Sequence, residues 1–134
     1  MIETSQQTDL NVGGVSLPAL IAARHHILLE GAEASTEAVL LALAPHLGGP
    51  VLRMQPGRTF APPTGEVGAV ILHSVDSLSA SDQTMLLGWL ADARQRTRII
   101  STTVHSLFAL VGRGLFDAHL YYRLNEVLLH VDGK

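Results

Sequence analysis

A histidine and a serine stand side by side in this sequence, and such a pair is a natural place to look for catalytic chemistry. His73 and Ser74 follow the nearly all-apolar run 67–72, which predicts a buried strand. A serine nucleophile needs a base within hydrogen-bond reach. Neighbouring residues at a strand end point to opposite faces, so these side chains cannot form a nucleophile and base pair with each other. A serine hydrolase built on this pair is therefore not expected.

The chain has seven histidines, but their spacing does not match a metal-binding motif. It contains no His-Glu-x-x-His pair and no cysteine, which removes the commonest local patterns for zinc. We therefore predict no metal site from local spacing. A cluster built from distant segments stays open, because His25, His73 and His105 all lie near the ends of predicted strands or turns.

Composition and charge exclude several classes of function. The formal net charge is −3 and the nine Lys and Arg residues are scattered along the sequence, so no overall basic field favours direct nucleic-acid binding. The absence of cysteine excludes disulfides and thiolate chemistry. No apolar run approaches the roughly 20 residues that span a bilayer, and the N-terminus lacks the features of a secretory signal. We expect a cytoplasmic protein without a membrane segment.

The length of 134 residues is typical of one domain with a real core. Hydrophobic residues make up 47% of the chain and aromatic residues only 4%, so the core must be mainly aliphatic. Residues 1–14 are predicted to form a flexible tail, and residues 15–134 a single domain. A short helix is expected to begin near Ser16, with Pro18 in its first turn, and to run to Ala23.

The rest of the chain is predicted to alternate between strands and helices. The predicted strands are 27–30, 50–54, 67–72, 98–102 and 126–130, and residues 55–66 form a loop. The predicted helices run from Ser35 or Thr36 to Leu47, from Ser79 or Ser81 to about Gln95, over 105–111 and over 114–123. This alternation predicts an α/β fold with three αβα layers around a mainly parallel sheet.

One C-terminal stretch carries a specific motif. Residues 114–125 read Gly-Leu-Phe-Asp-Ala-His-Leu-Tyr-Tyr-Arg-Leu-Asn, which resembles the Gly-x-Phe-Arg-x-Asp-Leu-Tyr-Tyr-Arg-Leu-Asn signature of the AAA+ domains of sigma-54-dependent transcriptional activators. Residues 68–75 are similar to the Walker B segment of that family, and residues 98–107 to its sensor strand. The resemblance covers about residues 27–131. It implies a P-loop-like core of five strands in the order 5-1-4-3-2, numbered along the chain.

The phosphate loop of this family works through glycines, backbone N–H groups and one lysine that face the nucleotide phosphates. Of its glycines only Gly31 remains here, while Ala34 and Thr36 replace others and Glu37 replaces the lysine. A carboxylate about 4 Å from a phosphate oxygen, at an effective dielectric near 20, is unfavourable by roughly 4 kcal/mol. The plainer interpretation of Glu33 and Glu37 is that acidic residues near a helix N-terminus stabilise its dipole.

The other positions that the family uses for catalysis have changed as well. His73 and Ser74 stand where the resemblance places the Walker B Asp, which holds magnesium, and the Glu that activates water. Val104 replaces the sensor Asn, and Asp117 replaces the first of two arginines, of which Arg123 keeps the second. The resemblance therefore implies a fold retained without ATPase chemistry and without a cofactor, since packing positions of the same motifs stay apolar: Leu72, Leu107, Phe116, Leu120 and Leu124.

These departures predict a non-catalytic protein-interaction module that regulates a sigma-54-dependent activator or associates with itself. The expected partner is an intact AAA+ activator or a second copy of this chain. In the rings of this family the region around residues 112–125 meets a neighbour, so the interface candidates are Phe116, Tyr121, Tyr122, Arg123 and Asn125. For Tyr121 and Leu124 we weigh packing within the chain's own core as an equal alternative.

Two further features limit or widen this hypothesis. The sequence lacks the family's Gly-Ala-Phe-Thr-Gly-Ala loop, which touches sigma-54, and it stops at Lys134 without a lid or DNA-binding domain. Direct activation of sigma-54 polymerase is therefore not expected. The alternative function is a domain that senses a small ligand or nucleotide in the crevice at the carboxyl ends of the strands, where open α/β sheets bind ligands.

Overall fold

The computed structural model describes residues 11–12, 15–16, 19, 22, 25–55, 61, 63, 67–92 and 94–131. Its centre is a sheet of five strands in the order β4-β5-β6-β3-β7, and every neighbouring pair is parallel. This order confirms the one expected from the family resemblance, read from the opposite edge. The strands are β3 (Ile27–Gly31), β4 (Val51–Met54), β5 (Ala69–Leu72), β6 (Arg98–Thr103) and β7 (Val127–Val131).

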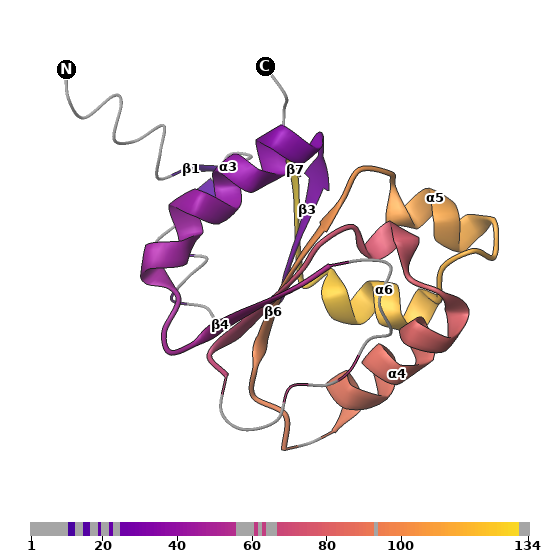
Figure 1. The fold of residues 1–134 in the computed structure, drawn as a ribbon. Helices are drawn as coiled ribbons and strands as arrows, with labels where there is room; N and C mark the ends of the chain where they lie inside the picture. Colours follow the sequence, from indigo (N-terminus) through magenta and orange to yellow (C-terminus); the bar gives the residue numbers. More distant parts are fainter. Residues whose placement is uncertain are drawn as a thin grey trace.

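Helices cover both faces of this sheet, which confirms the three αβα layers. Helix α3 (Glu33–Leu43) lies on one side, and α4 (Ala80–Ala91), α5 (Leu107–Gly112) and α6 (Ala118–Leu124) lie on the other (Figure 1). Two short 3₁₀ turns, η1 (Ala44–His46) and η2 (Val75–Ser77), follow α3 and β5. None of the helices in the described ranges is long and apolar enough to cross a membrane.

The hydrophobic core is split by the sheet into two parts. Along β3, Ile27 and Leu29 pack on the side of α3, while Leu28 packs on the side of α4, α5 and α6. This alternation follows from the strand geometry, because successive side chains point to opposite faces. Every residue of β5 and of β6 is buried, as expected for inner strands of a parallel sheet.

Helix α3 begins earlier than predicted. Neither Ser35 nor Thr36 caps it: the helix starts at Glu33, and the capping position is Ala32, whose side chain offers no hydrogen bond. Thr36 is instead a buried helical residue whose hydroxyl donates to the Glu33 carbonyl (3.0 Å). The chain therefore passes from β3 into α3 almost without a loop, at Gly31.

Helix α4 begins where the sequence predicts and ends sooner. Ser79 is the N-cap, and its hydroxyl accepts a hydrogen bond from the Asp82 N–H (3.1 Å). The prediction that the helix runs to about Gln95 is wrong, because Asp92 leaves the helical conformation. Its carboxylate instead accepts the Arg94 N–H (2.9 Å), a local turn that competes with continuation of the helix.

The last two helices are shorter than their predicted stretches. Helix α5 is capped by Ser106, whose hydroxyl accepts the Ala109 N–H (3.1 Å). The stretch predicted from residue 114 becomes helical only at Ala118, because Gly114 takes a left-handed conformation (φ +75°). The side chain of Asp117 then caps α6.

The N-terminal region departs from one expectation. Strand β1 (Asn11–Val12) pairs antiparallel with β2 (Val15–Ser16). Ser16 is a strand residue and not the start of a helix, since hairpin pairing fixes its backbone. Ala19 and Ala22 are helical, whereas the remaining residues of the predicted tail and helix lie outside the described residues. The division into a tail and one domain stays a prediction.

Candidate functional site

Parallel pairing gathers the carboxyl ends of the strands at one edge, where open α/β sheets bind ligands. Gly31 ends β3 and leads into α3, which carries Glu37. His73 and Ser74 follow β5, and Val104 follows β6. Five of the residues singled out from the sequence therefore share this edge.

A network of side chains joins two of these residues through a third that the sequence analysis missed. Arg53, in β4, donates from both terminal nitrogens to the Glu37 carboxylate (3.3 Å each). The Nη1 atom of Arg53 also lies 3.2 Å from Nε2 of His73. The positions expected to hold a lysine and a magnesium-binding carboxylate thus form one network, Glu37–Arg53–His73. The sequence held one signal for this network. Arg53 is a cation on β4, the strand that pairs with β5, and His73 follows β5.

The network fixes the protonation state of His73. A guanidinium group only donates hydrogen bonds, so Nε2 of His73 must accept, which leaves the proton of the neutral ring on Nδ1. Burial lowers the pKa of His73, and the charge of Arg53 lowers it further, against a smaller upward effect of Glu37 and Glu33. With His73 neutral, Glu33, Glu37 and Arg53 carry a combined charge of −1.

Ser74 takes part in separate interactions. It has a left-handed backbone (φ 53°), and its N–H donates to the Thr102 hydroxyl (3.0 Å). No hydrogen bond joins the His73 and Ser74 side chains within the described ranges. Val104 is exposed at the end of β6.

Asp117 lies outside the Glu37–Arg53–His73 network, and its hydrogen bonds hold the start of α6. Its carboxylate accepts the Leu120 N–H (3.0 Å), and its own N–H donates to the Gln83 side-chain oxygen (2.8 Å). Gln83 is buried, and its amide nitrogen donates to the carbonyls of Leu78 (3.1 Å) and Leu115 (3.3 Å). Gln83 therefore ties α4 to the segment that starts α6.

The structure divides the residues expected at an interface. Phe116 and Tyr121 are buried in the core, as is Leu124, which favours the packing alternative for them. Tyr122 is 67% exposed. Arg123 is exposed too, and its Nη1 donates to the Leu90 carbonyl (3.3 Å). Asn125 is half-buried and its N–H closes the last turn of α6.

Three aromatic side chains lie together beside this region, and two of them, Phe108 and Tyr122, are exposed. Phe108, in α5, is 67% exposed, and its ring centroid is 6.3 Å from that of Tyr121. The Tyr121 ring in turn makes an edge contact with Tyr122 at 5.2 Å. Phe108 was missed by the sequence analysis, although an aromatic residue directly after the buried Leu107 was a signal that it faces outward.

A small hollow opens beside Phe108 and Tyr121. It has a volume of about 280 Å³ and lies at the carboxyl ends of β3 and β7, between Phe108 and Tyr121. Leucines form its floor. At its rim, Nδ1 of His130 lies 2.8 Å from the carboxylate of Glu30, whose side chain is largely buried.

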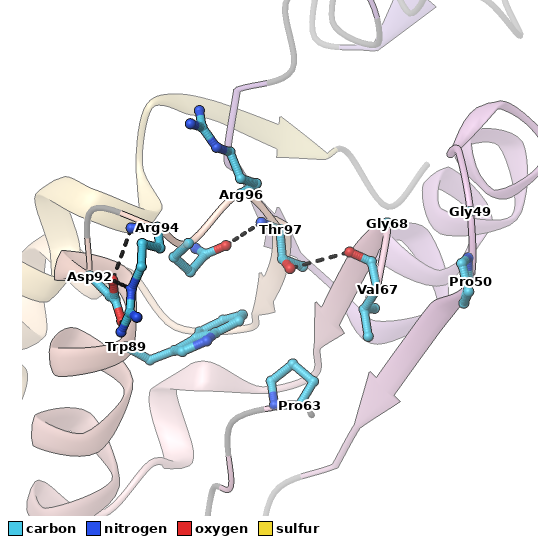
Figure 2. Close-up of a pocket in the computed structure, with 11 residues that line it drawn as sticks. Gly49, Pro50, Pro63, Val67, Gly68, Trp89, Asp92, Arg94, Arg96 and Thr97 are labelled. Carbon is cyan, nitrogen blue, oxygen red and sulfur yellow. Dashed lines mark hydrogen bonds and ion pairs between the residues drawn. The ribbon is translucent and has the colours of Figure 1, made fainter. Parts of the chain in front are cut away.

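The opposite edge of the sheet carries a larger hollow of about 850 Å³ (Figure 2). Trp89 and Pro63 lie on one side of it, and Thr97 and Val67, joined by a hydrogen bond from the Thr97 hydroxyl to the Val67 carbonyl (3.2 Å), lie on the other. The guanidinium of Arg94 turns back onto Asp92 (3.3 Å). Of the residues expected from the family motifs, the retained Arg123 lies at this edge, whereas those of the phosphate loop and the Walker B segment lie at the carboxyl ends of the strands.

The three histidines for which a cluster was left open, His25, His73 and His105, do not come together. His73 contacts Arg53, and Nδ1 of His105 lies 2.7 Å from the Asp76 carboxylate at the carboxyl ends of the strands. His25 precedes β3 and is therefore at the amino edge, because the sheet is parallel. In the part of the chain that the structure describes, no three His, Asp or Glu side chains are grouped closely enough to hold a metal ion.

Comparison with known structures matches the fold to P-loop NTPase domains. NtrX from Brucella abortus in complex with ADP superposes with a TM-score of 0.68 at 23% identity, over 96% of this chain and 38% of that one. The P-loop NTPase domain of a sigma-54 transport activator from E. coli gives 0.64 at 16% identity, over 86% of this chain and 88% of the other. RuvB of Thermotoga maritima gives 0.67 at 18% identity, over 87% and 42%.

Sequence comparison places the C-terminal half more closely. The HTH-type transcriptional regulatory protein TyrR of Enterobacter agglomerans is 36% identical over 75 residues, and that of Citrobacter braakii is 35% identical. Both matches cover 48% of this chain, which spans only 14% and 15% of those proteins. The family described as the sigma-54 interaction domain matches residues 62–133. This chain therefore belongs to the sigma-54 interaction domain family, the AAA+ domains of NtrC-like transcriptional activators.

Proposed function

We propose that this domain is a non-catalytic protein-interaction module in the control of sigma-54-dependent transcription. The observation that carries the non-catalytic part is the Glu37–Arg53–His73 network at the carboxyl ends of the strands. Since relatives of this chain are transcriptional regulators, we propose that it acts in the cytoplasm.

The charges of this edge oppose nucleotide binding. Arg53 is the cation of the network, and Glu37 already binds it through both carboxylate oxygens. A phosphate group would therefore meet a site with a net negative charge, and it would have to displace Glu37 from Arg53. Neutral His73 supplies no carboxylate for magnesium, which prefers oxygen ligands. Thus, among the described residues of this edge, the positions of the family's lysine and Walker B Asp no longer supply a cation for the phosphates and a carboxylate for magnesium.

The surface near α5 and α6 supports the interaction part of the proposal. Among the described residues, Phe108 and Tyr122 are the most exposed of the large hydrophobic side chains, each at 67%, and the Tyr121 ring contacts both of their rings. Aromatic residues are enriched where protein interfaces gain most of their binding energy. The partner that we propose is an intact activator of the same family or a second copy of this chain.

Two variants with a matched control test this proposal. Phe108→Ser and Tyr122→Ser remove the exposed rings, while Leu41→Ser removes an equally exposed apolar side chain, 63% exposed, from α3 on the other face. Analytical ultracentrifugation measures self-association, and titration with an intact activator AAA+ domain measures the second type of complex. We expect the ring variants to weaken one of these complexes about tenfold or more, and Leu41→Ser to leave it unchanged.

Two results would reject the interaction proposal. One is the absence of both complexes for the unaltered chain. The other is a complex that all three variants form equally well, since it would then not depend on Phe108 or Tyr122.

The second candidate function is sensing of a small ligand at the carboxyl ends of the strands. The hollow of about 280 Å³ beside Phe108 and Tyr121 favours it, because an apolar floor and the Glu30 carboxylate lie together there. Thermal-shift assays with ATP, ADP, GTP and cyclic dinucleotides test this candidate. A saturable shift that Glu30→Gln removes would support sensing, and unchanged melting with all of them would reject it.

A further inference from the structure

The hollow beside Phe108 and Tyr121 is large enough for a small organic molecule. Its volume is about 280 Å³, whereas an apolar cavity of about 150 Å³ already holds benzene. There is room, therefore, for a body somewhat larger than one six-membered ring. The residues of the floor are Leu28, Leu107 and Leu128, so the body that fits here is apolar.

Strand register places one carboxylate at the rim of this hollow. Glu30 in β3 is the pairing partner of His130 in β7. Because side chains alternate along a strand, Glu30 lies on the same face of the sheet as Leu28, the face that α4, α5 and α6 cover. Among the described residues that line the hollow, Glu30 is the only acidic one, and none is a lysine or an arginine.

The Glu30 carboxylate has one oxygen to offer a ligand. Its Oε1 lies 2.8 Å from Nδ1 of His130, and among the described residues Oε2 has no partner. When His130 is neutral and donates from Nδ1, the pair keeps a net charge of −1. The Glu30 side chain is only 15% exposed, so a cation placed against it is screened less by water than at the open surface.

Two aromatic rings complete the hollow. The rings of Phe108 and Tyr121 line it, with their centroids 6.3 Å apart. The face of an aromatic ring attracts a cation, and the attraction grows as water is excluded. A ligand without a charge would leave the Glu30 carboxylate partly desolvated and unpaired, which is costly. Rings, leucines and carboxylate together therefore favour a ligand that joins a positive charge to an apolar body.

From this arrangement we infer that the hollow binds a small organic cation, a primary amine on a compact apolar body. The ammonium group binds Glu30, and the body lies between the aromatic rings and the leucines. This inference rests on the second candidate function, since it assigns a ligand class to the same hollow.

NMR titration of the whole chain with cyclohexylammonium chloride tests the inference through the backbone amides of α5. Cyclohexanol is the neutral control, because it has nearly the same size and shape. The titration runs at about pH 8, above the ordinary imidazole pKa of about 6.5 and below the ordinary amine pKa of about 10.4, so the amine is charged. We expect saturable shifts with the amine and roughly tenfold or more weaker binding of the alcohol, since the attraction to the carboxylate is lost.

Three variants locate the binding. Glu30→Gln keeps the shape of the side chain and an oxygen that can accept from His130, but it should weaken amine binding by roughly tenfold or more. Phe108→Leu changes an exposed ring without disturbing the core and should weaken amine binding about two- to fivefold. Glu37→Gln is the matched control, because it removes a partly exposed carboxylate at the same edge but on α3, across the sheet. It should leave amine binding unchanged.

The inference is overturned if the amine and the alcohol bind equally, or if the amine shows no saturable binding. It is also overturned if Glu30→Gln or Phe108→Leu binds the amine as tightly as the unaltered chain, or if Glu37→Gln weakens binding as much as Glu30→Gln. Failure here is distinguishable from failure of the second candidate function. If a nucleotide shifts the melting temperature while the amine does not bind, only the ligand class inferred here is rejected.

Discussion

At the scale of single residues, the meaning of Glu37 and His73 depends on a neighbour. The sequence identifies both as replacements in motifs that normally bind nucleotide, but it does not show what they do. Arg53 contacts both of them, so these two replaced positions belong to one side-chain network. Its three side chains are only partly buried, and an exposed ion pair contributes about 0–1 kcal/mol. The network therefore matters for local charge more than for stability.

The loss of Arg53 and the loss of Glu37 should move the pKa of His73 in opposite directions. Arg53→Gln should raise the pKa, because the positive charge that lowers it is lost. Glu37→Gln should lower the pKa further, because Glu37 raises it at present. NMR titration of the His73 ring measures both, with Arg113→Gln, a change at an exposed arginine at the end of α5, as a control. Equal pKa values of His73 in the unaltered chain and in all three variants would contradict the network.

The same pKa determines how His73 affects stability. Its folded pKa is below the usual value of 6.5, so protonation favours the unfolded chain. The contribution of His73 to the free energy of unfolding is therefore complete above about pH 6.5 and is lost as the pH falls toward the folded pKa. In Arg53→Gln this loss should be smaller, as measured by urea unfolding across that range.

At the scale of elements, the junction between β3 and α3 explains why one loop glycine remains. A side chain on Gly31 would place its Cβ 2.3 Å from the Val131 carbonyl oxygen in β7. The close approach of β3 and β7 therefore requires glycine here, whether or not a phosphate binds. The retention of Gly31 is thus no evidence for a nucleotide site.

Two glycine substitutions test this packing role. Gly31→Ala should reduce the free energy of unfolding by about 1–3 kcal/mol, because β7 or α3 must shift to make room. Gly88→Ala in α4 has open space around the added Cβ and should raise stability by roughly 0.5–1 kcal/mol, since alanine favours a helix. Chemical denaturation measures both. Similar effects of the two changes would contradict the role given to Gly31.

The start of α4 gives a second pair of variants. Ser79 caps the helix through its hydroxyl, so Ser79→Ala should cost about 1 kcal/mol. Ser81 was the other candidate cap, but it lies exposed in the first turn, and Ser81→Ala should change stability by less than about 0.5 kcal/mol. Denaturant midpoints compare the two, and a larger loss in Ser81→Ala would contradict the assigned cap.

At the scale of the whole molecule, the sequence predicts the layers and strands better than the contacts between distant residues. Apolar runs such as 67–72 are local signals, and all five central strands were found near their observed bounds. Their spatial order came from the family resemblance, since periodicity alone does not set it. Periodicity could not decide whether His25, His73 and His105 meet for a related reason: it is the parallel pairing that places His25 at the edge opposite His73 and His105.

Side-chain clusters were the least predictable feature. Arg98 and Arg123 are 25 positions apart in sequence, and both line one hollow at the amino ends of the strands because α6 packs beside β6. The partnership of Arg53 with Glu37 likewise depends on contact between β4 and α3 across the edge of the sheet. No local pattern encodes either pairing. The same limit applied to Phe116 and Tyr121, which were candidates for a surface and are buried.

The central claim is that the carboxyl edge of this AAA+ fold no longer binds nucleotide phosphates. Calorimetric titration of the whole chain with ATP, with and without Mg²⁺, tests it most directly. The account predicts no Mg²⁺-dependent binding of ATP. Saturable binding of ATP that requires Mg²⁺ would contradict it.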